Sequence, residues 1–462
     1  MSKPRSLKAL IDVPAMTAVL TQRGLDLAVA LDKATLIARA ASNLLTAGLP
    51  ASAAARVWLV PGRIEVLGKH TDYAGGRSLV TAVERGFCMV ALPHEGSQMH
   101  VLACDIGEQA RFEISPDLTP ITGHWQNYPM TVVRRLSRNF PECRRGAVLA
   151  LSSDLPAAAG VSSSSAFIVG VYLAMAAIND LPATETFRRN IDTPESLSEY
   201  LGTIENGRTF RQLAGDRGVG TFGGSEDHTA ILCCQAGQLS QYAFCPVRLE
   251  RLIPLPADLV LAVASSGVRA EKTRHTMEQF NRASRLAAAV VEAWNRASGK
   301  HYGTLGDAMA NGGREAVGEI RQVLAGQTEA ASFSGDELVR RFDHFYSENE
   351  QIIPAAAAAL AAGDVASFGA LVDRSQAGAE ELLDNQVEQT IFLARSARQC
   401  GGLAASAFGA GFGGSVWALF AGDRAAEQLA AWRQAYHRAY PDLADHASFF
   451  LTRPGAAAFE LT

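Results

Sequence analysis

A run of small residues that leads directly into an apolar segment constrains this chain more than any other feature. Residues 155–166 read LPAAAGVSSSSA and continue into the run FIVGVYLAMAAI. A small-residue loop that feeds a helix presents several backbone N–H groups and the positive end of the helix dipole to one point. This arrangement suits a polyphosphate. A serine N-cap on a buried helix is the alternative, and the loop lacks the Gly-Lys-Ser/Thr ending of a P-loop.

The composition is that of an ordinary globular protein. With 462 residues, 48% of them hydrophobic and 19% charged, the chain can bury a substantial core, and its length predicts two domains or one large one. A net charge of −5 gives no global attraction to nucleic acid or to anionic lipid. No apolar stretch is long and uncharged enough to span a bilayer, so neither nucleic acid nor a membrane is an expected partner.

The cysteines and the N-terminus both point to the cytoplasm. Seven cysteines form an odd set without a C-x-x-C pair, which fits reduced thiols better than a disulfide framework or a zinc site. The N-terminal segment has an amphipathic helical pattern in place of a signal peptide, because Asp26, Asp32, Lys33 and Arg39 interrupt its apolar residues. We therefore expect a cytoplasmic protein, with an oligomeric state that the sequence leaves open.

A dense polar cluster follows residues 1–55, which themselves read as one or two helices. Residues 62–76 read GRIEVLGKHTDYAGG between two strand-like apolar runs. Arg63, Lys69, His70 and Asp72 place several hydrogen-bond donors and acceptors at this junction of strand and loop. A solvated turn between two strands is the alternative interpretation.

Three segments together resemble a known kinase superfamily. GRIEVLGKHTDYAGG resembles the first galactokinase signature, GRVNLIGEHTDYNGG. The serine loop resembles the second signature, PxGxGLSSSA, of the superfamily that joins galactokinase, homoserine kinase, mevalonate kinase and phosphomevalonate kinase (GHMP kinases). Residues 408–415, FGAGFGGS, resemble the third, TGAGFGGC. The resemblance covers roughly residues 55–425, and the first signature narrows it to the galactokinase branch.

The resemblance implies an α+β fold of two domains, with the nucleotide and sugar cleft between them. We place the boundary at the Pro254/Pro256 pair, because strand-like sequence lies on both sides of it. The expected units are an N-terminal domain of residues 1–256, including the helical extension 1–55, and a C-terminal domain of residues 257–462.

The resemblance also assigns cofactors and the residues that would hold them. ATP and Mg²⁺ are the implied cofactors. Ser164 and Glu205 would hold Mg²⁺, a hard cation that prefers oxygen ligands. The nucleotide phosphates would lie against the glycines and serines of the second and third signatures, which here are Gly160, Ser162, Ser163, Ser164, Ser165, Gly411 and Gly413.

Two further positions carry the expected catalytic roles. The family places a Gly-x-x-Asp-Gln segment against the reacting hydroxyl, and its aspartate matches Asp227, with His228 in place of the glutamine. Asp227 would accept the hydroxyl proton or hold the alcohol, and Arg63 would keep it ionised. A structural ion pair is the alternative. An insertion at residues 206–220 separates Glu205 from this segment.

The sugar would contact Lys69, His70, Asp72 and Gly224 by the same resemblance. Galactokinases carry glutamate where this chain has Lys69, at a position near the C6 end of the sugar. A cation there predicts preference for a carboxylate at C6, as in a uronic acid. The alternative is that Lys69 donates to a hydroxyl or pairs with Glu65. The family's sugar-contacting tyrosine is absent, and Met277 or Phe280 falls near its place.

These observations predict an ATP- and Mg²⁺-dependent sugar kinase that phosphorylates the anomeric hydroxyl of a monosaccharide. Galactose is the default substrate, and a uronic acid or an arabinose-like sugar is the alternative. A non-catalytic sugar sensor on the same fold is a rival of another class, although Arg63, Asp227 and the serine loop are all present. A kinase for a non-sugar alcohol is disfavoured by the sequence HTDY at residues 70–73.

Overall fold

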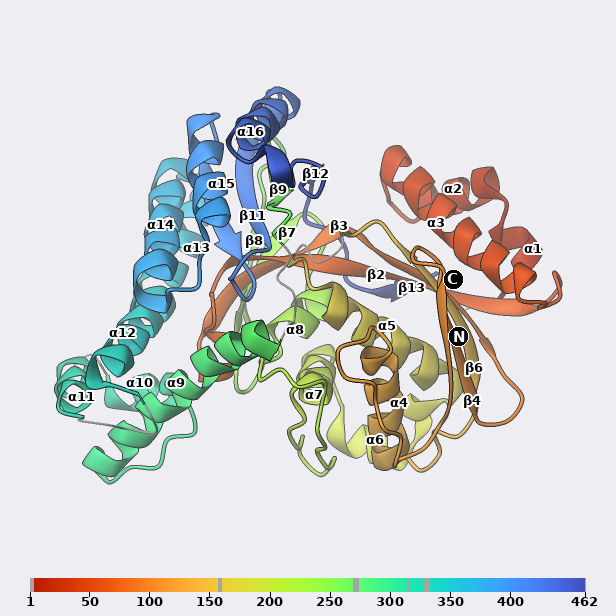
Figure 1. Cartoon of the computed structure of the whole chain (residues 1–462), viewed down its shortest axis with the longest axis horizontal. Coiled ribbons are helices and arrows are strands. Elements are labelled where there is room, and N and C mark those ends of the chain that lie inside the picture. The colour runs from red at the N-terminus through yellow and green to blue at the C-terminus, as the bar shows by residue number, and fades with distance from the viewer. Residues whose placement is uncertain (1–3, 157–159, 269–273, 314–315, 328–332, 462) are drawn as a thin grey trace.

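Two β-sheets with helices packed on them build the molecule, as a computed structural model shows (Figure 1). The structure describes residues 4–156, 160–268, 274–313, 316–327 and 333–461. The larger sheet has the order β1-β2-β3-β6-β4-β5, with β13 beside β2, β7 beside β3 and β8 beside β7. Its strands are β1 (Arg5–Ser6), β2 (Ala54–Leu67), β3 (Arg77–Pro93), β4 (Gln98–Ala103), β5 (Glu108–Glu113), β6 (Ala147–Ser153), β7 (Gln238–Ala243), β8 (Arg248–Pro254) and β13 (Phe459–Glu460).

The smaller sheet is antiparallel and has the order β10-β11-β9-β12. Its strands are β9 (Leu259–Ser265), β10 (Ala404–Phe408), β11 (Ser415–Ala421) and β12 (Ser448–Thr452). The chain therefore changes sheets between Pro254 and Leu259. Because β13 pairs with β2, the end of the described chain returns to the larger sheet.

Helices surround both sheets. Those that precede β9 are α1 (Leu7–Leu10), α2 (Val13–Gln22), α3 (Leu27–Thr46), α4 (Asn127–Asn139), α5 (Ser163–Ile178), α6 (Glu185–Asn190), α7 (Pro194–Asn206) and α8 (Glu226–Cys233). Those that follow it are α9 (Arg274–Ser298), α10 (Leu305–Gly312), α11 (Ala316–Ala325), α12 (Gly335–Tyr346), α13 (Ile353–Ala361), α14 (Val365–Gly378), α15 (Glu388–Gln399) and α16 (Ala425–Ala439). Among the described helices, none combines the length and the apolar character needed to cross a bilayer.

Strand β2 has both faces covered, which explains its nearly continuous apolar sequence. Successive side chains of a strand point to opposite faces. Val57 and Leu59 pack with the N-terminal helices, whereas Trp58 and Val60 pack in the core that contains α5. Figure 1 shows α1–α3 and α4–α5 on opposite faces of this sheet. The N-terminal extension is therefore part of the domain core.

The N-terminal extension contains three helices, where the sequence predicted one or two. Asp12 and Asp26 occupy the N-cap positions of α2 and α3, and the Asp12 side chain accepts a hydrogen bond from the backbone N–H of Ala15. Such caps end one helix and begin the next. The predicted helix after the serine loop is present as α5, and its apolar residues fill the core between the sheet and α4. All seven cysteines are free thiols.

Candidate active site

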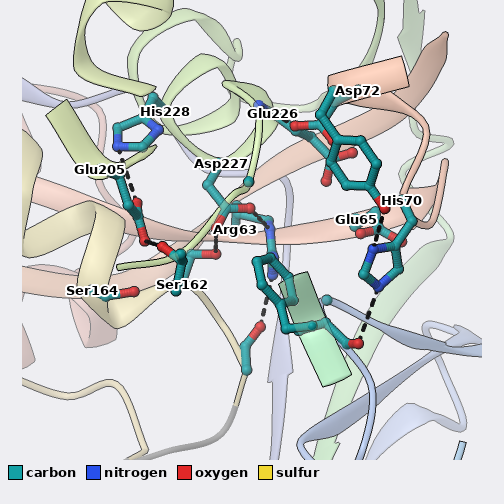
Figure 2. A pocket seen from close by; sticks show the side chains of 18 of the residues that line it. Arg63, Glu65, His70, Asp72, Ser162, Ser164, Glu205, Glu226, Asp227 and His228 are labelled. Carbon is teal, nitrogen blue, oxygen red and sulfur yellow. Dashed lines mark hydrogen bonds and ion pairs between the residues drawn. The ribbon is translucent and has the colours of Figure 1, made fainter. Parts of the chain in front are cut away.

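A cavity of about 230 Å³ brings most of the predicted site residues together (Figure 2). Its walls come from β2, the turn after it, the start of α5, the end of α7, the start of α8, α9 and the loop after β10. Elements that precede and follow the change of sheets therefore both contribute. The residues that line it are Arg63, Glu65, His70, Asp72, Tyr73, Gly160, Ser162, Ser163, Ser164, Glu205, Thr221, Gly223, Gly224, Glu226, Asp227, His228, Phe280, Gly409, Ala410, Gly411 and Phe412.

Arg63 and Asp227 form an ion pair on the cavity wall. Arg63 Nε donates to Asp227 Oδ1 at 2.7 Å, and Arg63 Nη1 donates to the carbonyl oxygen of Gly160 at 2.7 Å. The other oxygen of Asp227, Oδ2, accepts from the hydroxyls of Ser162 at 2.5 Å and Ser165 at 3.2 Å. Burial raises the pKa of Asp227, but the Arg63 guanidinium and the Ser162 hydroxyl outweigh it and lower the pKa below its usual value. The carboxylate is therefore ionised at neutral pH.

The serine loop turns sharply before α5 begins. Gly160 has φ 69° and Ser162 has φ 57°, both in the left-handed region, and no side chain caps the helix that starts at Ser163. Ser162, Ser163 and Ser164 line the cavity, so the positive end of a long helix faces it. This geometry fits the phosphates of a nucleotide. Residues 157–159 of the motif lie outside the described ranges.

Ser165 does not line the cavity but supports residues that do. Its side chain is 1% exposed, and its hydroxyl donates to Glu205 Oε2 at 2.9 Å as well as to Asp227. Glu205 also lies 3.5 Å from His228 Nε2 and accepts from the Thr221 hydroxyl at 3.4 Å. Burial lowers the pKa of His228, so its imidazole is neutral at neutral pH. The insertion has therefore not displaced Glu205 from the serine loop.

The oxygens of Ser164 and Glu205 fit Mg²⁺ better than a softer metal. Among the described residues, no group of three His, Cys, Asp or Glu side chains could hold a metal ion. A hydroxyl and a carboxylate leave the remaining positions to phosphate and water oxygens, which is the ligand set that Mg²⁺ commonly takes. Both residues line the same cavity as the N-terminal end of α5.

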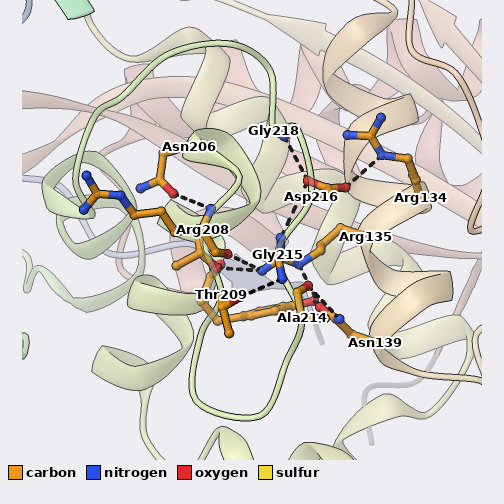
Figure 3. Close-up of polar contacts among 12 residues, drawn as sticks. Arg134, Arg135, Asn139, Asn206, Arg208, Thr209, Ala214, Gly215, Asp216 and Gly218 are labelled. Atoms are coloured by element: carbon orange, nitrogen blue, oxygen red, sulfur yellow. Dashed lines mark hydrogen bonds and ion pairs between the residues drawn. The ribbon is translucent and has the colours of Figure 1, made fainter.

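The insertion at residues 206–220 is anchored by two buried arginines (Figure 3). Arg134 Nε donates to Asp216 Oδ2 at 2.8 Å, and Arg135 Nη1 lies 3.6 Å from Asp216 Oδ1. The Asp216 side chain is 1% exposed. The chain then returns to the end of α7, where Val219 N donates to the carbonyl oxygen of Glu205 at 2.8 Å. The insertion thus packs beside Glu205, and the cavity lining resumes directly after it at Thr221.

At the other end of the cavity, the positions of His70 and Asp72 are fixed by hydrogen bonds. Burial lowers the pKa of His70 to about 4, so the ring is neutral. Its Nε2 lies 3.1 Å from the carbonyl oxygen of Ala410 and its Nδ1 lies 2.7 Å from the Tyr73 hydroxyl. Since a carbonyl only accepts, the network assigns the proton to Nε2. Asp72 Oδ2 accepts from the backbone N–H of Glu226 at 3.2 Å.

Two glycines permit close approaches at the cavity. A Cβ atom at Gly224 would collide with Oδ2 of Asp72, so only glycine allows Asp72 to lie against this segment. At Gly411, with φ 85°, a Cβ atom would collide with the backbone of Asn385. Gly411 lines the cavity, whereas Gly413 lies outside its lining and packs against Val268.

Lys69 does not line the cavity, contrary to the prediction that it faces the sugar. The residue is fully buried, and its Nζ donates to the hydroxyls of Ser406 at 2.8 Å and Ser375 at 3.3 Å. Ser375 also donates to Glu348, a buried carboxylate that accepts from the backbone N–H of Gly68. Burial is tolerable for an ammonium group that has hydrogen-bond partners and a nearby opposite charge. The basis for expecting a uronic acid is therefore absent.

Sequence reasoning gave no role at the site to Glu65 and Glu226, and it left the place of Phe280 undecided. Glu65 lies two residues after Arg63 on β2, so the two-residue period of a strand could have placed both on the same face. Glu226 directly precedes Asp227 at the start of α8. Phe280 lines the cavity, and its ring centroid lies 5.6 Å from that of His70. It is one of the two residues that the sequence suggested near the position of the family's tyrosine. The Met277 side chain lies outside the described part of the chain.

Comparisons with known proteins match three regions of the chain. The galactokinase galactose-binding signature matches residues 50–93, the GHMP kinase N-terminal domain residues 127–196, and the GHMP kinase C-terminal domain residues 356–438. This chain belongs to the galactokinase branch of the GHMP kinases. It therefore belongs to a family of ATP-dependent kinases.

Curated relatives and solved structures agree with this assignment. The galactokinase of Roseiflexus sp. (strain RS-1) is 28% identical over 386 residues, which is 82% of this chain and 87% of the relative. The galactokinase of Chloroflexus aggregans is 28% identical over 391 residues, which is 82% of this chain and 88% of the relative. Lactococcus lactis galactokinase complexed with galactose superposes with a TM-score of 0.71 at 21% identity, covering 88% of this chain and 95% of that one. Methanococcus jannaschii mevalonate kinase shares the fold at a TM-score of 0.51 and 12% identity, with 86% and 98% covered.

Proposed function

We propose that this protein is a sugar kinase that transfers the γ-phosphoryl group of ATP to the anomeric hydroxyl of a hexose of the galactose type. The observation that carries the proposal is the position of Asp227. Its ionised carboxylate lies between the serine loop, which suits phosphates, and the cluster of His70, Asp72 and Gly224, which suits hydroxyls. The galactokinase galactose-binding signature supports a sugar as the acceptor.

Different residues of the chain bind the phosphates, stabilise charge and accept the proton. The backbone at Ser162, Ser163 and Ser164 binds the phosphates, and the Arg63 guanidinium stabilises the negative charge that develops during transfer. Asp227 holds the attacking hydroxyl and accepts its proton, while the hydroxyl oxygen forms the new bond to phosphorus and ADP departs.

Metal binding is assigned to the same end of the cavity. Ser164 and Glu205 would hold Mg²⁺, which offsets phosphate charge when bound. The Ser165 hydroxyl, by donating to Glu205 Oε2, keeps that carboxylate pointed toward the serine loop. We also place the reaction in the cytoplasm, where ATP is supplied.

Release of ADP by the purified protein tests the proposal. The assay contains ATP, Mg²⁺ and one of galactose, arabinose, galactosamine, galacturonate or glucuronate, with Asp227→Asn as the blank. We expect ADP release with a galactose-type sugar and an anomeric phosphate in the ³¹P NMR spectrum. Binding of sugar without ADP release from any of them would overturn the kinase assignment and favour a sugar sensor.

A further inference from the structure

Three carboxyl groups gather at the sugar end of the cavity. They belong to Glu65, Asp72 and Glu226, and we refer to them together as the acidic subsite. Each residue lines the cavity, and they are 4%, 8% and 5% exposed respectively. Figure 2 shows them beside His70, on the far side of Asp227 from Glu205. Neither Glu65 nor Glu226 was expected at the site from the sequence.

The positive charges of Lys69 and Arg63 lower the pKa of Glu65, but neither group donates a hydrogen bond to Glu65 Oε1. Among the described residues that line the cavity, Arg63 is the only lysine or arginine, and its guanidinium is engaged by Asp227 and Gly160. Lys69 Nζ is directed to Ser406 and Ser375. The neutral imidazole of His70 adds no charge, and Arg341, which donates to the His70 carbonyl oxygen, does not line the cavity.

The hydrogen bonds of the subsite are incomplete. Glu226 Oε2 accepts from the Ser78 hydroxyl, and Asp72 Oδ2 accepts from the backbone N–H of Glu226. Glu65 Oε1, by contrast, is buried and has no hydrogen-bond partner among the described residues. A buried acceptor without a donor, on a residue beside a cavity, costs free energy until a ligand supplies a donor. Glu65 therefore marks where a donor of the ligand would lie.

The carboxyl groups also resist ionisation while no donor is present. Burial raises the pKa of Glu65 to about 7, against the lowering effect of Lys69 and Arg63, and it raises that of Asp72 to about 6. Burial, together with the charges of Glu65 and Asp72, raises the pKa of Glu226 well above its usual range. A ligand with a positive charge would favour the ionised carboxylates, whereas a ligand with a carboxylate would add a further negative charge.

We propose that the acidic subsite selects a sugar that carries an amino group, whose ammonium donates hydrogen bonds to Glu65 and Glu226. This inference rests on the proposed sugar kinase function and names the substrate class of the same site. An ammonium group has three N–H donors and one positive charge, which match an unpartnered carboxylate oxygen and an acidic lining. The same lining rejects a uronic acid.

The first experiment compares sugars that differ in charge. Initial rates at pH 7 with galactosamine, galactose, N-acetylgalactosamine and galacturonate give kcat/KM for each, and calorimetry without ATP gives their affinities. We expect kcat/KM for galactosamine to exceed that for galactose by about tenfold, with galacturonate the poorest substrate. N-acetylgalactosamine has an uncharged group at the same position, so its kcat/KM should not exceed that for galactose.

The second experiment locates the preference in named residues. In Glu65→Gln and Glu226→Gln, the kcat/KM for galactosamine should approach that for galactose. The affinities for the two sugars should also become equal. Glu185→Gln, at an exposed position of α6 outside the cavity lining, controls for the loss of one negative charge. Glu65→Asn provides a smaller amide if Glu65→Gln fails to fold.

Two outcomes would overturn the inference. One is a wild-type protein that handles galactose as well as galactosamine in both measurements, and the other is a preference that survives in both variants. Failure of the kinase function is distinguishable from these. If no sugar releases ADP but galactosamine still binds about tenfold more tightly than galactose, the subsite assignment stands and the kinase assignment fails.

Discussion

The two ends of the cavity differ in how far the protein satisfies its own charged groups. At the phosphate end, both oxygens of Asp227 accept hydrogen bonds, and Arg63 is bound to Asp227 and Gly160. At the sugar end, Glu65 Oε1 has no described partner, and the pKa values of Glu65 and Asp72 are raised by burial. The end proposed for phosphates is therefore preorganised for phosphoryl transfer, whereas the end proposed for the sugar depends on donors that the ligand brings.

The strongest test of this contrast is the removal of charge at the preorganised end. Asp227→Asn keeps the size of the side chain but loses the group that accepts the hydroxyl proton. We expect kcat to fall by about 10²- to 10⁴-fold, with a small change in the KM for sugar. Steady-state rates measure both, and the exposed Asp423→Asn is the matched control. A variant that retains wild-type kcat would remove Asp227 from the chemistry.

A smaller effect is expected from Glu205, which lies at the same end and which we propose holds Mg²⁺. Glu205→Gln keeps the contact with Ser165 and loses the negative charge. The Mg²⁺ concentration that gives half-maximal rate should rise by at least about tenfold, while the affinity for sugar stays the same. Glu195→Gln, in the first turn of the same helix and outside the cavity lining, is the control. An unchanged Mg²⁺ titration would contradict the assignment.

At the sugar end we expect a pH dependence. Burial raises the pKa of Asp72 to about 6, with Glu226, Asp227 and Arg63 as the groups that face it. Asp72 is ionised above that pH and gains a proton as the pH falls through it, so it becomes a poorer acceptor for sugar donors. The KM for sugar should rise roughly tenfold between pH 7 and pH 5. In Asp72→Asn the KM for sugar should be high and should not change between pH 7 and pH 5. A wild-type KM that is the same at both pH values would contradict this role of Asp72.

The smallest effect on catalysis is expected at Lys69, which belongs to neither end. Lys69→Met removes the donor to Ser406 and Ser375 within a buried network, so the free energy of unfolding should fall by about 1–3 kcal/mol. The ratio of kcat/KM for galactose to that for galacturonate should stay within about twofold, because Nζ does not reach the cavity. Chemical denaturation and steady-state rates measure the two effects. A large change in that ratio would return Lys69 to the sugar site.

Motifs that act through their own backbone were predictable from the sequence. Residues 155–166 predicted a phosphate loop before a helix, and α5 begins at Ser163 with its first residues in the cavity. The segment around His70 and Asp72 forms the turn between β2 and β3. The expectation of one or two N-terminal helices was less accurate, because the capping positions at Asp12 and Asp26 divide the segment into three.

Residues whose roles depend on distant partners could not be placed in this way. Glu205 contacts Ser165 although an insertion follows it in the chain, and Arg134 and Arg135, on α4, pair with Asp216 of that insertion. The sequence contains these residues but gives no indication that they meet. Pairing across such separations is decided by packing of the elements and not by local spacing.

The sequence by itself predicted the loop before α5, because the backbone geometry of such a short segment is set locally, and its signatures identified the family. The roles of Arg63 and Asp227 were predicted through the resemblance to that family. Only the tertiary structure decided which way Lys69 points and that Glu65 and Glu226 line the sugar end. The hydroxyls that bind Lys69 come from more than 300 residues later in the chain. A buried charge turns toward whichever partners the folded chain places beside it, and one strand cannot specify them alone.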